Sequence, residues 1–314
     1  MNMTAIRFRR LCLTISLVLA AVTEPAAAVE SSATALFGSP PPGRFASLGT
    51  HRLYYHCSGS QGPTVVIDAG LGGSAVEWSE VQTALSQEHR VCSYDRAGYA
   101  WSDTGPAPRT ADVELAELVQ LLEAIGEPPP YLLVGHSYGG FIMRLFAARA
   151  PDMVAGLVLV DSSHPDEIPQ TGTAAPGQPP QRNALDVKRF EADFDDLPPA
   201  LAQSMFLNSR RKAVFAQMDE LAGFSASAAL VAASGRLGNL PLVVLSRDHE
   251  AGSDTSQEAH WHELQRSLAA LSASGELRII SGSGHNLHVT HPRAVTAAVD
   301  SVAALAAQRA EVTD

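Results

Sequence analysis

The chain has 314 residues, 46% of them hydrophobic, and a formal net charge of −11 at pH 7. This length and apolar content suffice for one large domain with a full hydrophobic core, and no internal repeat argues otherwise. Because an acidic chain repels phosphate groups and anionic lipids, nucleic acids and membrane surfaces are not expected as partners.

Residues 1–28 have the pattern of a secretory signal peptide. Basic residues come first, then an apolar run over residues 11–22, then the small residues that signal peptidase requires (Arg7, Arg9 and Arg10; Ala26, Ala27 and Ala28). The apolar run is short for a bilayer span, and an uncleaved membrane anchor is the alternative. Cleavage would remove three arginines and one glutamate, which changes the net charge from −11 to −13. We therefore expect a secreted or periplasmic protein without stable membrane association.

Residues 29–44 are rich in Ser, Ala and Pro and predict a flexible leader before the domain. Strand and helix patterns then alternate. Short apolar and β-branched runs predict strands at residues 52–57, 64–68 and 90–94. Ser74 and Glu77 have the spacing of a capping box before a helix that includes Trp78, which we expect in the core. Apolar residues at helical spacing predict another helix over residues 111–125.

The stretch from Tyr131 to Ala150 has the order strand, sharp turn, helix. A buried strand is followed without a spacer by Gly135-His136-Ser137-Tyr138-Gly139, and then by an apolar segment of helical length. A serine in such a turn has a strained backbone, so its hydroxyl projects above the end of the sheet. This G-x-S-x-G context makes Ser137 the candidate nucleophile. The alternative is a glycine-rich turn whose serine only caps the helix.

The second half continues the alternation. A strand is predicted at residues 156–160, residues 165–181 are too rich in Pro and Gly for an element, and residues 182–236 predict two or three short helices. The later expectations are a strand at 240–246, a polar loop at 247–257, a helix around 261–271 and a strand at 276–280. Pro292 opens the last helix, whose Val295, Val299, Val302 and Leu305 are expected to face the sheet. The pattern predicts an α/β fold with a mostly parallel sheet covered by helices on both faces.

G-H-S-Y-G-G at residues 135–140 and L-V-L-V-D at residues 157–161 are similar to the esterase and lipase-like members of the α/β-hydrolase superfamily. The resemblance runs from about Phe45 to the end of the chain, with a variable middle. It implies a core formed by residues 45–164 and 237–314. It also implies a helical cap, inserted between two core strands over residues 165–236, that covers the active site.

A serine hydroxyl needs a neighbouring base, usually a neutral imidazole. His285 follows the last predicted strand in a Gly-rich loop, where the resembled family carries its base. Four other histidines compete less well, because His136 is inside the turn and His164, His288 and His291 lack this setting. A metal site from His249, His260 and His262 has no supporting pattern.

The carboxylate that orients the imidazole stays open at this point. The resemblance implies a place just after the strand at 240–246, where Asp248 and Glu250 stand, or a place one strand earlier, where Asp161 stands. Both places follow the order nucleophile, acid, base. We favour Asp161, because chains with this elbow and L-V-D-S-S-H-P-D often have no acid after the later strand. Asp248 and then Glu250 are the alternatives.

The resemblance also implies an oxyanion hole made by the backbone N–H groups of Leu71 and Tyr138. Ala69 replaces the family's usual His before Gly70, which changes a side chain but leaves the main-chain donor in place. The segment from Asp95 to Ser102 is similar to a loop that braces the site in the family. We expect Asp95 and Arg96 to form an internal ion pair there.

Signal cleavage would leave two cysteines, Cys57 and Cys92. In the resembled fold their strands are neighbours, and an exported protein can form disulfides. The alternatives are a disulfide between them and two buried thiols.

The residues and the resemblance together indicate an exported serine hydrolase that cleaves carboxylic esters of small molecules through an acyl-enzyme, without a cofactor or metal. Acyltransferases, amidases, peptidases and cofactor-free peracid-forming enzymes use the same triad. A non-catalytic ligand-binding member of the fold is the alternative of another class. The related dehalogenases and epoxide hydrolases carry Asp at the elbow, which Ser137 excludes here. Acyl length, alcohol and oligomeric state are not predictable from the sequence.

Overall fold

The computed structural model describes residues 43–167 and 197–313, with side chains up to Glu311. The predicted signal peptide, residues 29–42 of the predicted leader and residues 168–196 of the predicted cap lie outside this part of the chain.

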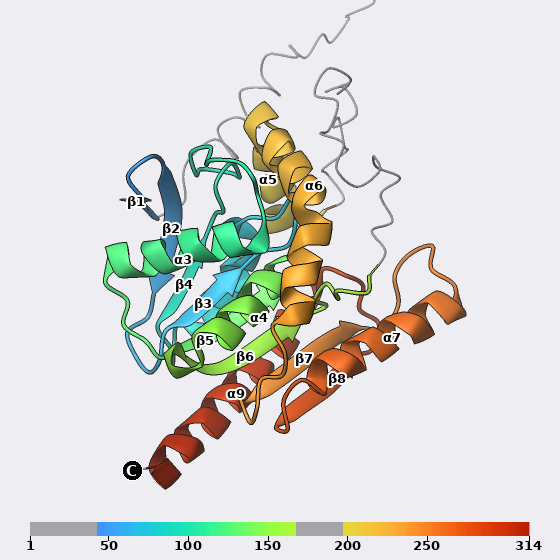
Figure 1. Ribbon diagram of the computed structural model, residues 1–314. Helices are drawn as coiled ribbons and strands as arrows, with labels where there is room; N and C mark the ends of the chain where they lie inside the picture. The colour runs from blue at the N-terminus through green and yellow to red at the C-terminus, as the bar shows by residue number, and fades with distance from the viewer. Residues whose placement is uncertain (1–42, 168–196, 314) are drawn as a thin grey trace, which may run out of the picture. The chain divides into compact units, whose positions relative to one another are not determined.

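An eight-stranded sheet in the order β1-β2-β4-β3-β5-β6-β7-β8 forms the centre of the fold (Figure 1). Strands β1 and β2 pair antiparallel with each other, and β2 pairs antiparallel with β4. All later pairs are parallel. The strands are Arg44–Ser47, Arg52–Ser58, Val65–Asp68, Val91–Tyr94, Tyr131–His136, Val154–Val160, Leu242–Arg247 and Gly275–Ile280. The predicted α/β fold with a mostly parallel sheet is confirmed.

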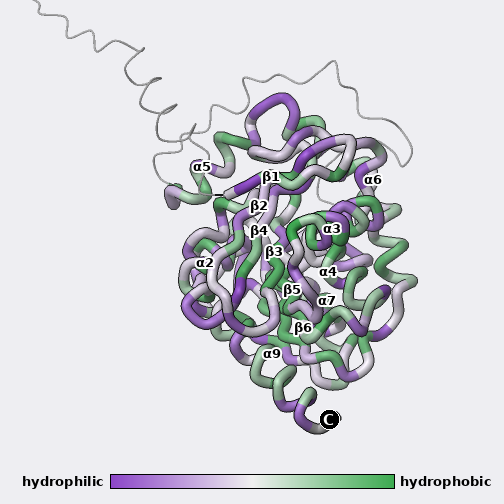
Figure 2. The backbone as a smooth tube through the Cα atoms, turned by 90° about the vertical axis from the view of Figure 1, so that its left-hand side faces the viewer, coloured by the Kyte–Doolittle hydropathy of each residue, from purple (hydrophilic) through white to green (hydrophobic). Residues whose placement is uncertain are grey.

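Helices cover both faces of the sheet, because the inner strands are apolar on both sides. On β5, Leu133 packs into a core with α3, α4, α6 and α7, whereas Leu132 and Val134 pack into a second core with α2 and α9. Figure 2 shows the strands running between these two groups of helices. The helices are η1 Ala75–Trp78, α2 Ser79–Leu85, α3 Ala111–Ile125, α4 Gly139–Arg149, η2 Pro151–Met153, α5 Pro199–Asn208, α6 Arg211–Ala233, α7 Thr255–Ala269, α8 Leu287–Thr290 and α9 Pro292–Thr313.

In the sequence, helices α5 and α6 lie between β6 and β7, within the segment predicted as a cap. Helix α6 packs on α3 and α4, and α5 packs on η1 (Figure 1). Both helices therefore rest on the elements that follow the carboxyl ends of the core strands, where α/β sheets bind their ligands.

Three local expectations were wrong. Ser74 makes no capping hydrogen bond, because its hydroxyl bonds that of Ser204 on α5 and the Glu77 carboxylate also accepts from Ser204. Helix α7 begins at Thr255 instead of near residue 261, because Asp254 and Gln257 form a true capping box there. Leu305 is 40% exposed, whereas Val295, Val299 and Val302 are buried as predicted.

Trp78 is fully buried, as predicted. Within residues 43–167 and 197–313, no helix is both long enough and apolar enough to cross a membrane.

Candidate active site

Ser137 lies in a sharp turn between β5 and α4 and has a backbone φ of 49°. A non-glycine residue in this left-handed region is strained, and it persists only where its surroundings fix it. Here the Ser137 N–H donates to Val160 O (3.2 Å), and its carbonyl accepts from Gly140 N (2.9 Å) and Ser163 N (3.1 Å). The turn therefore holds Ser137 partly exposed between buried neighbours.

The two flanking glycines are required by close backbone approach. A Cβ on Gly139 would lie 2.6 Å from the carbonyl oxygens of Asp68 and Ala69, and one on Gly135 would lie 2.7 Å from Gly139 O. Both distances are far inside van der Waals contact. Larger residues would push the turn away from the end of β3.

His285 follows β8 and lines the same cavity as Ser137. Its ring Nδ1 lies 2.6 Å from Oδ2 of Asp161, and its side chain is 35% exposed. Three further bonds fix its main chain: the N–H donates to Glu250 Oε2 (2.8 Å), and the carbonyl accepts from His136 Nε2 (3.0 Å) and from the Leu287 N–H (3.0 Å). A carboxylate therefore holds the ring at one edge, and no described residue is hydrogen-bonded to its Nε2.

Asp161 is fully buried at the end of β6, in a left-handed conformation with φ 41°. Its Oδ1 accepts from the Arg247 N–H (3.0 Å) and Trp261 Nε1 (2.8 Å), and its Oδ2 accepts from Arg247 Nη1 (3.0 Å) and faces His285. These donors stabilise the ionised form of the carboxylate. Of the three carboxylates considered, the structure brings only this one to the imidazole.

Opposing effects set the pKa values of this pair. Burial disfavours the charge on Asp161, but its bond with His285 and the nearby Arg247 keep the pKa of Asp161 below its ordinary value. Burial likewise disfavours the imidazolium, yet the Asp161 carboxylate raises the pKa of His285 above its ordinary value. The pair is therefore built to stabilise a proton on His285 while Asp161 stays ionised.

The two alternative carboxylates have other partners. Asp248 Oδ2 accepts from the backbone N–H of Gly282 (3.0 Å), so it braces the loop that leads to His285. Glu250 bonds the main chain of His285 and not its ring. Both side chains support the loop from outside the imidazole–carboxylate pair.

Leu71 and Tyr138, the predicted oxyanion donors, flank Ser137. A Cβ on Gly70 would lie 3.1 Å from Ser137 Cβ, which places the loop before Leu71 directly against the nucleophile turn. Neither N–H is used by a hydrogen bond within the described residues.

The expected ion pair between Asp95 and Arg96 is wrong. Arg96 binds Asp68 (2.7 Å) and, on helix α6, Glu220 (2.9 Å). Its guanidinium also donates to the carbonyls of Ala69 and Gly70, so it braces the loop that carries Leu71.

Asp95 instead accepts from the N–H groups of Ala75 (2.8 Å) and Trp101 (3.1 Å). Burial raises the pKa of Asp95 to about 7. Adjacent residues on one loop point to opposite sides, which sequence adjacency cannot reveal.

The competing histidines lie apart from the serine hydroxyl or are already bonded. Burial, together with His288 and His285, holds the pKa of His136 well below its ordinary value. His288 Nε2 faces Glu77 (3.2 Å), and His164 bonds Ser267 (2.8 Å) and Asp166 (3.0 Å). His291 bonds its neighbour Thr290.

The shared cavity has a volume of about 570 Å³. Its walls combine polar and apolar groups, and the residues that line it beside Ser137 and His285 are Glu167, Arg247, Glu250, Ala251, Gly252, Ser253, Gln257, His260, Trp261 and Leu264. Burial raises the pKa of Glu167 despite the bonds it accepts from Ser163 and His164. The residues that line the cavity therefore include hydrogen-bonding groups, and Ser137 lines the same cavity.

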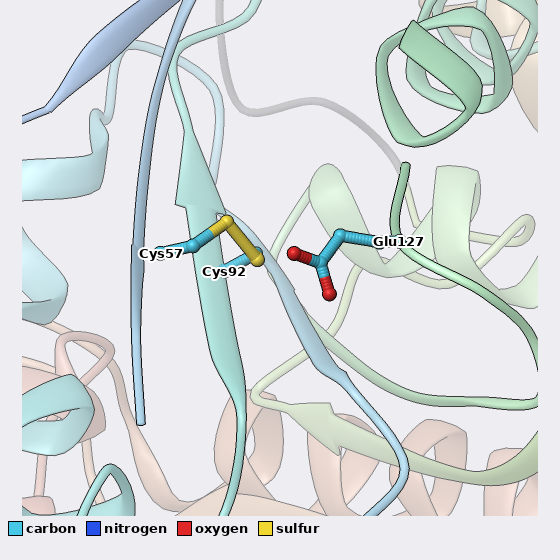
Figure 3. Close-up of side chains that lie close together, drawn as sticks. All are labelled: Cys57, Cys92 and Glu127. Atoms are coloured by element: carbon cyan, nitrogen blue, oxygen red, sulfur yellow. A yellow bond between two sulfur atoms is a disulfide. The ribbon is translucent and has the colours of Figure 1, made fainter. Parts of the chain in front are cut away.

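Cys57 and Cys92 form a disulfide between the paired strands β2 and β4 (Figure 3). Glu127 lies beside it, and the three side chains are the one grouping in the described chain with metal-ligand proximity. The sulfurs are bonded to each other, however, and Glu127 binds Arg90 and Thr64. The site is a covalent link between strands.

The sequence patterns do not single out Arg247, Trp261 or Glu258. Arg247 and Trp261 bond Asp161 directly, and Glu258 bonds Arg247. One pattern could have indicated Arg247, because it is a charged residue at the end of a buried strand. The carboxyl ends of parallel strands lie at the same edge of a sheet, so charged residues there are close to one another.

A family model described as alpha/beta hydrolase fold matches residues 63–220. The uncharacterized protein YqjL of Bacillus subtilis (strain 168) is 31% identical over 255 residues, which cover 81% of this chain and 89% of YqjL. The chain belongs to the α/β-hydrolase family.

Solved structures share the fold at lower identity. A lipase described as putative, lip1 of Acinetobacter baumannii AYE, has a TM-score of 0.65 at 18% identity and covers 90% of this chain and 97% of its own. A thermophilic esterase of Thermogutta terrifontis has a TM-score of 0.63 at 20% identity, with 85% and 99% covered. These likenesses concern the fold, so the reaction must be argued from the site.

Proposed function

We propose that this protein is an exported serine hydrolase that cleaves carboxylic esters through an acyl-enzyme. One observation carries the proposal: the His285 imidazole is bonded at Nδ1 to the buried Asp161 and lines the same cavity as Ser137. A strained serine, a buried carboxylate and an imidazole follow one another in the chain as Ser137, Asp161 and His285. This is the order and the set of groups that acyl transfer requires.

The tautomer of His285 follows from the acid. An ionised carboxylate only accepts hydrogen bonds, so Nδ1 carries the proton and Nε2 carries the lone pair. Nε2 then takes the Ser137 proton as Oγ attacks the ester carbonyl, and Asp161 stabilises the imidazolium. The Leu71 and Tyr138 N–H groups receive the developing oxyanion.

Collapse of the tetrahedral intermediate breaks the bond to the alcohol, which leaves with the proton from Nε2. Water then attacks the acyl-enzyme with His285 as base, and the acid is released. The polar groups on the cavity wall favour short or polar substrates over long alkyl chains.

Labelling with a fluorophosphonate probe tests the nucleophile. We expect wild-type protein to be labelled and Ser137→Ala to be unlabelled, with Ser281→Ala as a matched control on an exposed serine of the His285 loop. A panel of p-nitrophenyl esters of graded acyl length then measures turnover. Absence of labelling in folded protein would favour a non-catalytic binder, and labelling without ester turnover would favour transfer to another acceptor.

Export rests on the N-terminal pattern and gains support from the Cys57–Cys92 disulfide, because such bonds persist in oxidising compartments. Fractionation of expressing cells and mass measurement of the mature chain test it. We expect a product that begins at Val29, outside the cytoplasm. A full-length chain that fractionates with membranes would support the uncleaved anchor instead.

A further inference from the structure

We propose that Arg247 and Trp261 are positioning residues for the Asp161–His285 pair, and that Arg247 limits how tightly this pair holds a proton. The inference rests on the proposed function, because it assigns the base of that reaction to His285. Arg247 and Trp261 lie outside the proposed triad and oxyanion hole. The pKa of His285 reports on their role without turnover.

Four hydrogen bonds fix the orientation of the Asp161 carboxylate. Two donors bind Oδ1, the Arg247 N–H and the Trp261 indole N–H. Two bind Oδ2, Arg247 Nη1 and His285 Nδ1. Arg247 thus touches both oxygens, once with its main chain and once with its side chain. The plane of the carboxylate is fixed by groups on β7 and α7, independently of His285.

The supporting bonds also close into a ring. Arg247 Nε donates to Glu258 Oε2 (3.2 Å), and Glu258 Oε1 accepts from the Glu250 N–H (2.9 Å). Glu250 Oε2 accepts from the His285 N–H (2.8 Å), and His285 returns to Asp161. The catalytic histidine is therefore connected to its acid twice, through its ring and through its main chain.

Arg247 is itself held firmly. Its guanidinium lies over the Trp261 ring, with Cζ 4.2 Å from the centroid, and its side chain is only 13% exposed. Asp161 and Glu258 both accept from it. Two carboxylates and an aromatic face therefore hold the Arg247 guanidinium in place. It serves the triad although it also borders the cavity.

The positive charge of Arg247 acts on the proton of His285. The charged or titratable groups that face His285 from neighbouring elements are Asp161, Arg247, Glu167, Glu250, His136 and His260. Asp161 and Glu250 favour the imidazolium, whereas Arg247 disfavours it. Without Arg247, the Asp161 carboxylate would keep the proton on His285 up to a higher pH. At a given pH, a smaller fraction of the enzyme would then have a neutral His285 to act as base.

The test is Arg247→Met, which keeps the length of the side chain and removes its charge. We expect the acid limb of the kcat/KM profile to move to higher pH by about one unit, and kcat at its plateau to fall roughly tenfold as the carboxylate loses a fixed donor. Arg278→Met is the matched control, since Arg278 pairs with Glu276 on β8 away from the cavity. An unmoved or lowered acid limb overturns the proposal.

NMR titration of isotope-labelled histidine separates this proposal from the proposed function. The His285 signals are assigned by their loss in His285→Gln, and their pKa is measured with no substrate present. A raised pKa in Arg247→Met supports the proposal even if no ester is cleaved, and an unchanged pKa in folded protein overturns it.

If Arg247→Met does not fold, Arg247→Lys replaces it. Lysine keeps the charge but lacks the fork that reaches Asp161 and Glu258 together. We expect the His285 pKa to stay near the wild-type value while kcat falls several-fold. Trp261→Phe keeps the ring and removes only the indole donor, and we expect a similar fall in kcat with KM unchanged. Wild-type kcat in both variants would overturn the positioning role.

Discussion

Nε2 of His136 donates a hydrogen bond to the main-chain carbonyl of His285, across 3.0 Å and 149 positions of the sequence. Because a carbonyl can only accept, the proton of neutral His136 is on Nε2. His136 lies one residue before Ser137, the proposed nucleophile. The residue next to the proposed nucleophile therefore holds the loop of the proposed base.

We expect His136→Leu to lower kcat by roughly ten- to a hundredfold, because the His285 carbonyl loses one of its two donors, keeps only the Leu287 N–H, and the loop loosens. His136→Gln can place an amide N–H near the position of Nε2, and it should retain much more activity. Ester turnover at saturation measures both, with His249→Gln on an exposed position as control. Equal loss in His136→Leu and His136→Gln would show that packing alone matters.

The choice between the carboxylates is tested by a pair of isosteric changes. Asp161→Asn should reduce kcat by about four orders of magnitude, since an amide cannot stabilise the imidazolium and favours the wrong tautomer. Asp248→Asn should stay within a few-fold of wild type, because among the described residues the Asp248 carboxylate accepts only from the Gly282 N–H, and an amide leaves an acceptor there. Circular dichroism checks folding. If Asp248→Asn were inactive and Asp161→Asn active, Asp248 and not Asp161 would be the acid of the triad.

Activity should fall as the pH decreases through the pKa of His285. The base must be neutral to accept the serine proton, and the Asp161 carboxylate raises its pKa despite burial. The acid limb of kcat/KM should therefore lie above the ordinary histidine value of about 6.5. A profile measured in buffers of constant ionic strength gives this value. A midpoint clearly below 6.5 would contradict the inferred ion pair.

The Cys57–Cys92 disulfide closes a sequence separation of 35 residues. Loop-closure entropy predicts a loss of about 3 to 4 kcal/mol on its removal. We expect Cys57→Ala/Cys92→Ala to unfold at lower urea concentration while kcat of the folded enzyme stays near wild type, since the bond lies far from the residues that line the cavity. Equilibrium unfolding under two-state conditions measures the loss. Unchanged stability would show that strand pairing alone holds β2 to β4.

Local patterns predicted the architecture, because strand and helix periodicities and the turn at Ser137 are properties of short segments. The Gly-rich loop, together with the family resemblance, also made His285 the candidate base. The acid could not be chosen in this way. Asp161 and Asp248 both follow parallel strands and reach the same edge of the sheet, and only the donors from Arg247 and Trp261 decide which carboxylate is fixed toward the ring.

The failed capping box has the same origin. Ser74 and Glu77 have the correct spacing, but Ser204 arrives from 130 positions away in sequence and takes both side chains. Long-range partners override local propensity wherever a buried polar group can be satisfied in two ways.

Glu220 on α6 is fully buried and binds Arg96, whose guanidinium also holds the carbonyls beside Leu71. Lifting α6 would break this buried ion pair and leave Asp68 as the remaining carboxylate partner of Arg96. The pair therefore resists movement of α6 away from the core. Residues 251–253 line the cavity and have no charged side chain, so substitutions there are the simpler way to admit bulkier molecules.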